Sequence, residues 1–193
     1  MKAQVPTTCA TALKEWATVI EAMGRGEQVV LIRKGGLIEP GSGFELAAPA
    51  FLFYPTFEHQ AVNYLREPFR GYFEAAKAAR APEGQVRFSL FGQAMHAAPS
   101  HDPQVVKRLE PFHIYNEAFL TQRLKWQPEQ PLMVVIVRAY RLTSPQTIAA
   151  APQYAGCKSW VNLDAPVACD APQPVLDDAA FAARRREIES LLY

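Results

Sequence analysis

The sequence lacks several features that would assign a protein to a functional class at once. Its 193 residues contain three cysteines, an odd number without C-x-x-C spacing, so neither a disulfide framework nor a self-contained zinc site is predicted. No run of about eighteen apolar residues occurs, and the start of the chain has no apolar signal segment, so we expect a cytoplasmic protein that does not enter a membrane. The formal net charge is only +1, and nucleic-acid binding would therefore depend on a local basic patch.

Recognisable motifs of catalysis and metal binding are absent as well. No G-x-G-x-x-G, P-loop or G-x-S-x-G sequence occurs, which argues against the nucleotide-binding folds built on these motifs and against an α/β-hydrolase. The four histidines are scattered, and no two have the spacing that would place them on one face of a helix. We therefore predict neither a metal nor a cofactor.

The composition is that of a folded globular protein. Apolar residues make up 49% of the chain and charged residues 20%, which is enough for one well-formed core. Segments with helical and with strand-like apolar patterns alternate irregularly, without a βαβ rhythm. We predict an α+β fold with a mixed sheet or small β-barrel flanked by several helices. One domain is expected over residues 1–175, with an amphipathic helix over residues 176–193 appended to it.

The boundaries of the expected elements follow from capping and breaking residues. Helices are predicted at residues 11–24, 56–81, 103–126 (interrupted near Pro111) and 176–193. Strands are predicted at residues 27–33, 44–54, 85–95, 130–142 and 158–163. Asp102 before Pro103 is typical of a helix N-terminus, as is Asp177 before Asp178. The segments "HAAPSHDP" (96–103) and "TSPQTIAAAPQYAGC" (143–157) are predicted to be loops.

The first candidate binding segment is "RKGG", residues 33–36. Arg33 and Lys34 stand at the end of a predicted strand, and Gly35 and Gly36 form a turn whose backbone amides can approach an anion such as phosphate. The alternative is an edge strand that its charges protect from aggregation, followed by an ordinary turn.

The second candidate is "YPTFEHQ", residues 54–60. Thr56 is suited to cap the predicted helix and Glu58 to interact with its positive end, so both have structural explanations. His59 and Gln60 have none. Glu58 and His59 would point about 100° apart on a helix, so if either acts as an acid or base, its partner comes from elsewhere in the chain.

Two further segments carry polar groups. His113, Asn116 and Arg123 would share a face of the third helix and could read a planar or anionic group; a solvated helix face is the alternative. In "YAGCKSWVNL", Lys158 could lower the pKa of Cys157 and activate the thiol, although a single cysteine without an assigned base is more often structural. Trp160 either packs in the core or stacks on a base.

Four blocks in a fixed order resemble the DUF1802 family, which is described only as a domain of unknown function. They are "ALKEWATVIEAMGRGEQVVLIRKGG", "FELAAPAFLFYPTFEHQ", "RLKWQPEQPLMVVIVRAYRL" and "YAGCKSWVNL", and they extend over residues 12–164. The resemblance therefore identifies related proteins but implies no particular reaction. Residues 16–33 are also similar to the opening of ASCH and other PUA-like domains, at Trp16, at Gly24 or Gly26, and at Arg33. This similarity implies a small β-barrel flanked by helices, whose cleft often accommodates RNA or a modified nucleobase.

Three functional hypotheses follow. The first is binding of nucleic acid or a nucleotide (RNA, single-stranded DNA or a modified nucleotide) through a basic, aromatic-lined cleft that includes the RKGG turn. The second is a hydrolase or nuclease that uses Glu58 or His59 with Cys157, Lys158 or His113. The third is a protein-interaction module, in which the C-terminal helix binds a partner or forms a homo-oligomer.

Overall fold

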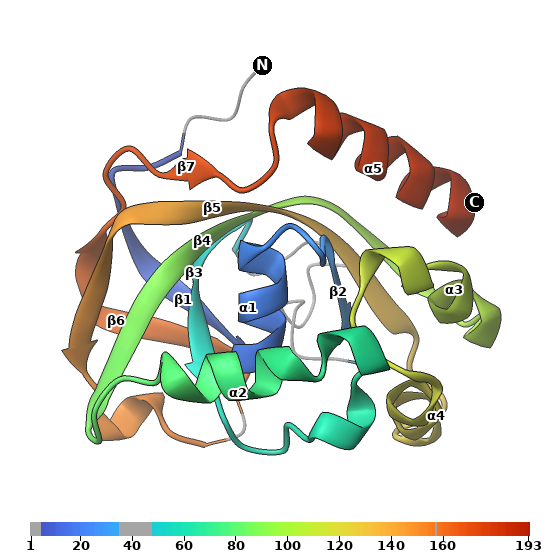
Figure 1. Ribbon diagram of the computed structural model, residues 1–193, viewed down its shortest axis with the longest axis horizontal. Coiled ribbons are helices and arrows are strands. Elements are labelled where there is room, and N and C mark those ends of the chain that lie inside the picture. Colours follow the sequence, from blue (N-terminus) through green and yellow to red (C-terminus); the bar gives the residue numbers. More distant parts are fainter. Residues whose placement is uncertain (1–4, 35–47, 157) are drawn as a thin grey trace.

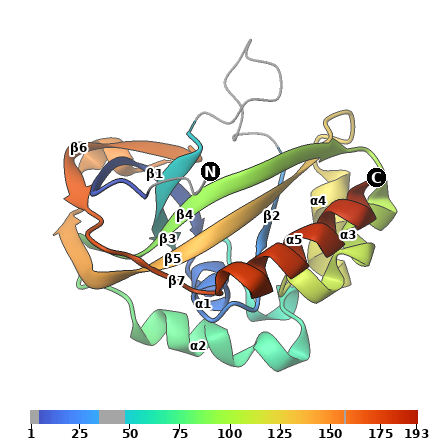
Figure 2. The ribbon, with the colours of Figure 1, turned by 90° about the horizontal axis from the view of Figure 1, so that it is seen from above.

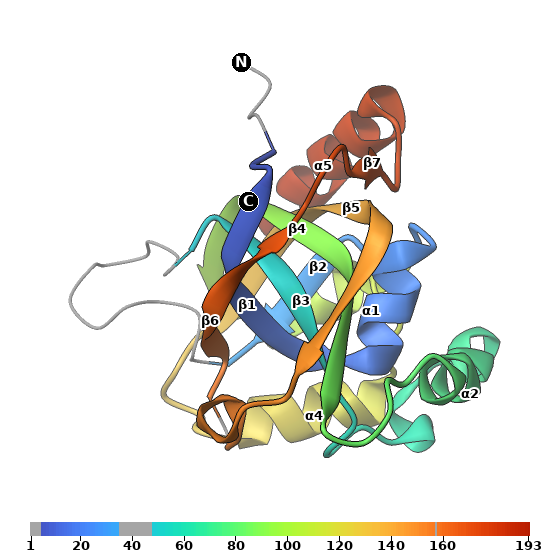
Figure 3. The same ribbon diagram turned by 90° about the vertical axis from the view of Figure 1, so that its left-hand side faces the viewer.

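The computed structural model describes residues 5–34, 48–156 and 158–193 (Figure 1). Its centre is a mixed seven-stranded sheet with the strand order β2-β5-β4-β3-β1-β6, and the short β7 pairs with β5. The strands are β1 Thr8–Trp16, β2 Val30–Arg33, β3 Ala50–Thr56, β4 Gln85–Ser100, β5 Leu132–Ala149, β6 Trp160–Ala168 and β7 Gln173–Pro174. β1 and β3 are parallel, while the other pairs are antiparallel. The strands curl round a common interior (Figure 3), and the order found among the described residues is open between β2 and β6.

Helices cover this sheet on several sides. The α-helices are α1 Ala17–Gly24, α2 Gly71–Ala78, α3 Pro103–Arg108, α4 Glu117–Lys125 and α5 Asp178–Leu192. Short 3-10 turns occur at Val62–Tyr64, Glu67–Phe69, Glu110–Phe112 and Pro152–Tyr154. α5 runs along the outside of β5 towards α3, whereas α2 lies on the opposite side of the molecule (Figures 1 and 2). None of the helices in the described residues is long and apolar enough to span a membrane.

The long β4–β5 pair gives the sheet its curvature. The two strands pair from Gln85 opposite Ala149 to Ser100 opposite Leu132, with register shifts between Phe88 and Leu90 and between Ala94 and His96. Such irregularities bend a strand and increase its twist. β5 also pairs with β2 at one end and with β7 further along.

The core lies mainly between the curled sheet and α1. Six of the eight residues of α1 are buried, and the helix contacts β1, β3, β5 and α2. A second buried cluster on the other side of the strands contains Leu52, Phe88, Phe91, Tyr154 and Val161. The α+β class is confirmed, with a curled mixed sheet flanked by helices.

Several predicted elements agree with the structure. The apolar run in β5 is buried from Leu132 to Val137. The Asp102 side chain accepts a hydrogen bond of 2.8 Å from Gln104 N at the start of α3, and Asp177 accepts one of 2.7 Å from Ala180 N at the start of α5. These features depend on neighbours in sequence, which is why the pattern indicated them correctly. The division into a domain over residues 1–175 and an appended helix stays a prediction.

The helix predicted over residues 11–24 is wrong in its first half. Residues Thr8–Trp16 form β1, which pairs with β3 on one side and β6 on the other, and only Ala17–Gly24 is helical. The apolar residues Ala12, Leu13 and Trp16 fit a helical period as well as a strand with both faces covered. Pairing with two neighbouring strands satisfies the backbone hydrogen bonds of this segment and decides between the two.

The helix predicted over residues 56–81 is also largely wrong. Thr56 is the last residue of β3, so it does not cap a helix, and Glu58 does not lie in a first helical turn. His59 has a positive φ of 61°, and helical structure is limited to two 3-10 turns and α2. Part of each predicted loop is strand instead, because β4 extends to Ser100 and β5 to Ala149 as they pair with each other.

We predict that Gly92→Ala destabilises the protein. A Cβ atom at this position would lie 2.8 Å from the rings of both Phe51 and Phe53, and overpacking of this kind typically costs about 1–3 kcal/mol. Urea unfolding measures the change. Gly71→Ala is the matched control, since a Cβ there meets no atom within 4 Å; equal losses for the two variants would contradict the prediction.

Candidate functional site

Two of the predicted segments meet at the carboxyl end of β1. Arg33 donates hydrogen bonds to Glu15 Oε2 at 2.8 Å, to the Lys14 carbonyl oxygen at 2.9 Å and to Ser159 Oγ at 2.9 Å. The side chains of Glu15 and Arg33 are 7% and 17% exposed. Glu15 Oε1 also accepts a hydrogen bond of 2.8 Å from Trp16 N. The RKGG and GCKSW segments are therefore joined, through Arg33 and Ser159, around a buried ion pair.

The YPTFEHQ segment reaches the same place from β3. The Thr56 hydroxyl donates to the Glu15 carbonyl oxygen at 3.1 Å. Gln60 Oε1 accepts hydrogen bonds from Thr18 N at 3.3 Å and from Thr18 Oγ1 at 2.9 Å. The residue at the N-cap position of α1 is Trp16, whose side chain makes no capping bond, so Gln60 satisfies an amide at the beginning of that helix. Glu58 and His59 are exposed.

Lys34 also interacts with the protein itself. It is 5% exposed, and its Nζ donates a hydrogen bond of 3.0 Å to the carbonyl oxygen of Leu124. Leu124 lies in the last turn of α4, where the helix dipole favours a cation. Gly35, Gly36 and Cys157 lie outside the described residues. Lys158 is exposed and donates a hydrogen bond to the Gln153 carbonyl oxygen.

The predicted polar face of His113, Asn116 and Arg123 is divided among three environments. Asn116 caps α4 by accepting a hydrogen bond of 3.2 Å from Phe119 N, and the Arg123 guanidinium lies 5.0 Å from the centre of the Phe119 ring. His113 is fully buried, with Nε2 at 3.0 Å from the Val106 carbonyl oxygen. Burial lowers the pKa of His113 to about 4, so the imidazole is neutral at physiological pH.

Trp160 is half-buried and packs edge-to-face on Phe51, with 5.4 Å between the ring centres. Its indole nitrogen is buried without a hydrogen-bond partner among the described residues. The indole therefore packs within the fold in this structure. In the described part of the chain, no group of three or more His, Cys, Asp or Glu side chains is placed to hold a metal ion.

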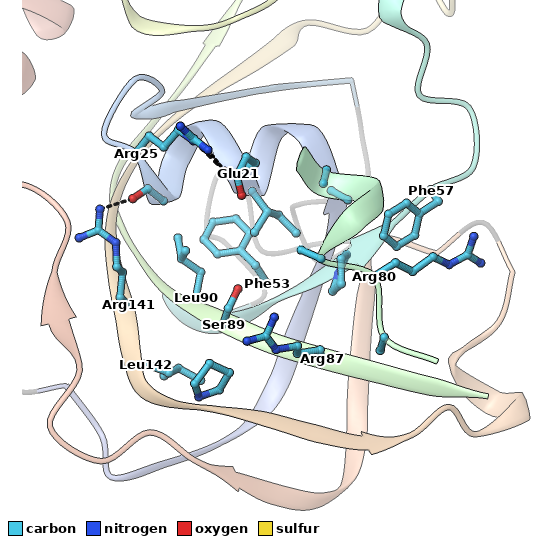
Figure 4. Close-up of a pocket in the computed structure, with 18 residues that line it drawn as sticks. Glu21, Arg25, Phe53, Phe57, Arg80, Arg87, Ser89, Leu90, Arg141 and Leu142 are labelled. Atoms are coloured by element: carbon cyan, nitrogen blue, oxygen red, sulfur yellow. Dashed lines mark hydrogen bonds and ion pairs between the residues drawn. The ribbon is translucent and has the colours of Figure 1, made fainter. Parts of the chain in front are cut away.

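A surface groove lies beside this junction. One hollow of about 400 Å³ is bounded by α1, α2, β4 and β5 (Figure 4). A second hollow of about 420 Å³ lies between the end of β3, residues 80–87 and residues 150–156. Both hollows share the lining residues Pro55, Phe57, Arg80, Ala81 and Arg87. We call these two adjacent hollows the arginine groove.

The first hollow is strongly basic. Among the residues that the structure describes, four exposed arginines line it, and the one carboxylate in the lining, Glu21, is paired with Arg25. The four are Arg25, Arg80, Arg87 and Arg141. Figure 4 shows Arg25, Arg87 and Arg141 around the hollow, with Arg80 and Phe57 together at one end.

Three of the four arginines have contacts within the protein. Arg25 Nε donates to Glu21 Oε1 at 2.7 Å, and this carboxylate raises the pKa of Arg25. Arg141 donates to the Gly24 carbonyl oxygen at the end of α1, and the Arg80 guanidinium lies 4.6 Å from the centre of the Phe57 ring. Arg87 makes no side-chain hydrogen bond, ion pair or ring contact with the described residues, and it stands beside Ser89 on the same face of β4.

Of the residues nominated from sequence, Thr56 and Glu58 line the second hollow of the groove. The sequence did not indicate that the four arginines lie together, because each comes from a different part of the fold. Arg25 follows α1, Arg80 follows α2, Arg87 lies in β4 and Arg141 lies in β5. One local signal was present. Arg87 and Ser89 alternate with the buried residues Val86, Phe88 and Leu90, which places both polar side chains on one face of a strand.

Comparison with known proteins gave two matches. A family model described as Domain of unknown function (DUF1802) matches residues 12–187. No curated protein matches the chain. Among solved structures, the chain is similar to a crystal structure of a mutant ZmASCH protein from Zymomonas mobilis. The identity is 11% and the TM-score 0.48, with 82% of this chain and 91% of the other covered.

We predict that Arg33→Met strongly destabilises the protein. The change leaves the Glu15 carboxylate buried without its cation, and breaking a buried pair in this way costs roughly 3–5 kcal/mol. Chemical unfolding measures the loss. The double variant Arg33→Met with Glu15→Leu should recover most of it, because an apolar pair of similar volume carries no buried charge. A double variant as unstable as the single one would contradict the role of the ion pair.

We also predict that His113 makes the protein less stable at acidic pH. The pKa of His113 is about 4 in the folded protein and about 6.5 in an unfolded chain, so the unfolded state binds the proton more readily between these values. The contribution of His113 is complete above pH 6.5 and is lost as the pH falls to 4, by about 3 kcal/mol. The free energy of unfolding measured across this range should decrease less steeply for His113→Gln. If the free energy of unfolding fell equally steeply with pH for the unchanged protein and for His113→Gln, His113 would not be the cause of the acid sensitivity.

Proposed function

The chain belongs to the DUF1802 family, and we propose that it binds single-stranded nucleic acid in the arginine groove. The observation that carries this proposal is that four exposed arginines line one hollow, whose lining among the described residues contains a single, already paired carboxylate. A hollow lined by more cations than carboxylates favours an anionic ligand. Guanidinium groups are suited to bind phosphate through paired N–H donors.

Aromatic groups in the same groove favour nucleic acid over a simple anion. Phe53 and Phe57 line the first hollow, and Tyr54, Phe57 and Tyr154 line the second. Phe53 and Tyr154 are buried, so Phe57 and Tyr54 provide the accessible aromatic surface. Phe57 is only half-buried, so part of its ring is accessible to a base. Proteins that bind single strands combine a basic groove with aromatic side chains on which bases stack. The arginine groove contains both kinds of group.

The arginine groove, and not the RKGG segment, would then contact the phosphates. Arg33 and Lys34 hold Glu15, Ser159 and the end of α4, so their substitution should affect stability before it affects a ligand. Arg87 offers a cleaner test, since it is exposed and makes no side-chain interaction with the described residues. Its removal should leave the fold unchanged.

We predict that Arg87→Gln lowers the affinity for single-stranded nucleic acid about tenfold, as expected for one lost charged hydrogen bond. The slope of log affinity against log salt should decrease by about 0.7, because one phosphate contact fewer releases counterions. Fluorescence anisotropy with labelled oligouridine and oligothymidine of about ten nucleotides measures both quantities.

The matched control is Arg186→Gln. Arg186 is exposed on α5, on the opposite side of the molecule from α2, and the substitution removes the same charge. Failure of both oligonucleotides to bind at low salt would refute the proposal. Equal effects of the two substitutions would show that the net charge, and not the groove, governs binding.

A further inference from the structure

We infer that the arginine groove holds two consecutive nucleotides, one in each hollow, with the connecting phosphate between Arg80 and Arg87. This inference rests on the proposed function and adds the minimum size of the ligand. Its first support is the shape of the groove. The two hollows are similar in volume, about 400 and 420 Å³, and each lies within the range of roughly 300–1,000 Å³ typical of sites for small molecules. A single nucleotide would leave one of them unfilled.

The second support is the identity of the residues that the hollows share. In the described part of the chain, Arg80 and Arg87 are the cations that line both hollows, and Phe57 is the aromatic residue common to them. A chain that passes from one hollow to the other must cross this boundary. The linking phosphodiester, which is the charged part of the connection, would lie next to the two shared guanidinium groups.

The third support is the difference in charge between the hollows. The first contains Arg25 and Arg141 in addition to the shared arginines. The second contains Lys14, which donates to the Gly156 carbonyl oxygen at 2.9 Å, together with the carboxylates Glu58 and Glu83. Carboxylates disfavour a phosphate but accept hydrogen bonds from amino and hydroxyl groups. The second hollow is therefore suited to a base and its sugar, while further phosphates lie in the first.

Phe57 supplies the stacking surface at the boundary. In the free protein the Arg80 guanidinium covers the ring at 4.6 Å from its centre, an arrangement favoured by attraction between a cation and an aromatic face. A base can stack on the ring if the Arg80 side chain, which is exposed, swings towards the phosphate. Phe57 and Arg80 would then contact adjacent parts of the same ligand.

Comparison of a nucleoside monophosphate with a dinucleoside monophosphate of the same base tests this inference. At pH 8 the first carries about two negative charges, because its terminal phosphate is fully ionised, whereas the second carries one. Binding by charge alone favours the mononucleotide. Two occupied hollows favour the dinucleotide, by at least about fivefold if the second base gains a stacking contact. Isothermal titration calorimetry or competition against a labelled oligonucleotide measures both affinities in the full-length protein.

Substitutions at Arg80 and Phe57 test whether these residues produce the preference for the dinucleotide. Arg80→Gln changes an exposed side chain, so it tests the inference without endangering the fold, and it should abolish the preference for the dinucleotide. Phe57→Ala should lower dinucleotide affinity about tenfold, and Phe57→Tyr should restore it. Arg186→Gln should change neither affinity.

The outcomes separate this inference from the proposed function. Equal or tighter binding of the mononucleotide would overturn the two-nucleotide groove, even while longer oligonucleotides still bind through Arg87. Stronger competition by tripolyphosphate than by the dinucleotide would overturn it too, because charge alone would then explain binding. If no oligonucleotide binds at low salt, the proposed function fails, and this inference fails with it.

Discussion

The buried ion pair between Glu15 and Arg33 joins parts of the chain that are far apart in sequence. Arg33 at the end of β2 reaches the carboxylate, the backbone of β1 and Ser159, while Thr56 at the end of β3 binds the carbonyl oxygen of Glu15. A charge pair at this depth is tolerated only when hydrogen bonds also satisfy its remaining polar atoms. The ends of three strands are thereby held in one place, directly before the chain turns into α1.

The position of α1 and of the groove follows from this junction. Gln60 satisfies the first turn of α1 from outside the helix, and the other end of the helix carries Arg25 and accepts a hydrogen bond from Arg141. Phe57 follows directly after Thr56 and becomes the boundary between the two hollows. A network of buried polar contacts thus supports a surface groove whose own arginines remain exposed. Stability and ligand binding would therefore depend on different residues, although the two groups lie close together.

Much of the fold could be predicted where the deciding interactions are local. The strand β5, the capped starts of α3 and α5, and the α+β class follow from apolar runs and from side chains within three residues of the amides they cap. β1 could not be predicted, because its apolar spacing suits a helix and its identity depends on pairing with β3 and β6. Gln60 looked free of structural purpose because its partner, Thr18, is 42 residues away.

The same distinction applies to function. The sequence by itself determined that positive and negative charges nearly balance and that no recognised metal-binding or nucleotide-binding motif is present. It also identified two polar segments, RKGG and YPTFEHQ, whose side chains needed an explanation. Only the tertiary structure decided that Arg33 and Lys34 bind the protein's own carboxylate and carbonyl groups, and that Arg25, Arg80, Arg87 and Arg141 line one hollow. The physical reason is that the spacing of neighbouring residues predicts which side chains share one face of a strand or helix. The convergence of several faces depends on how a long, bent β4–β5 pair curls the sheet.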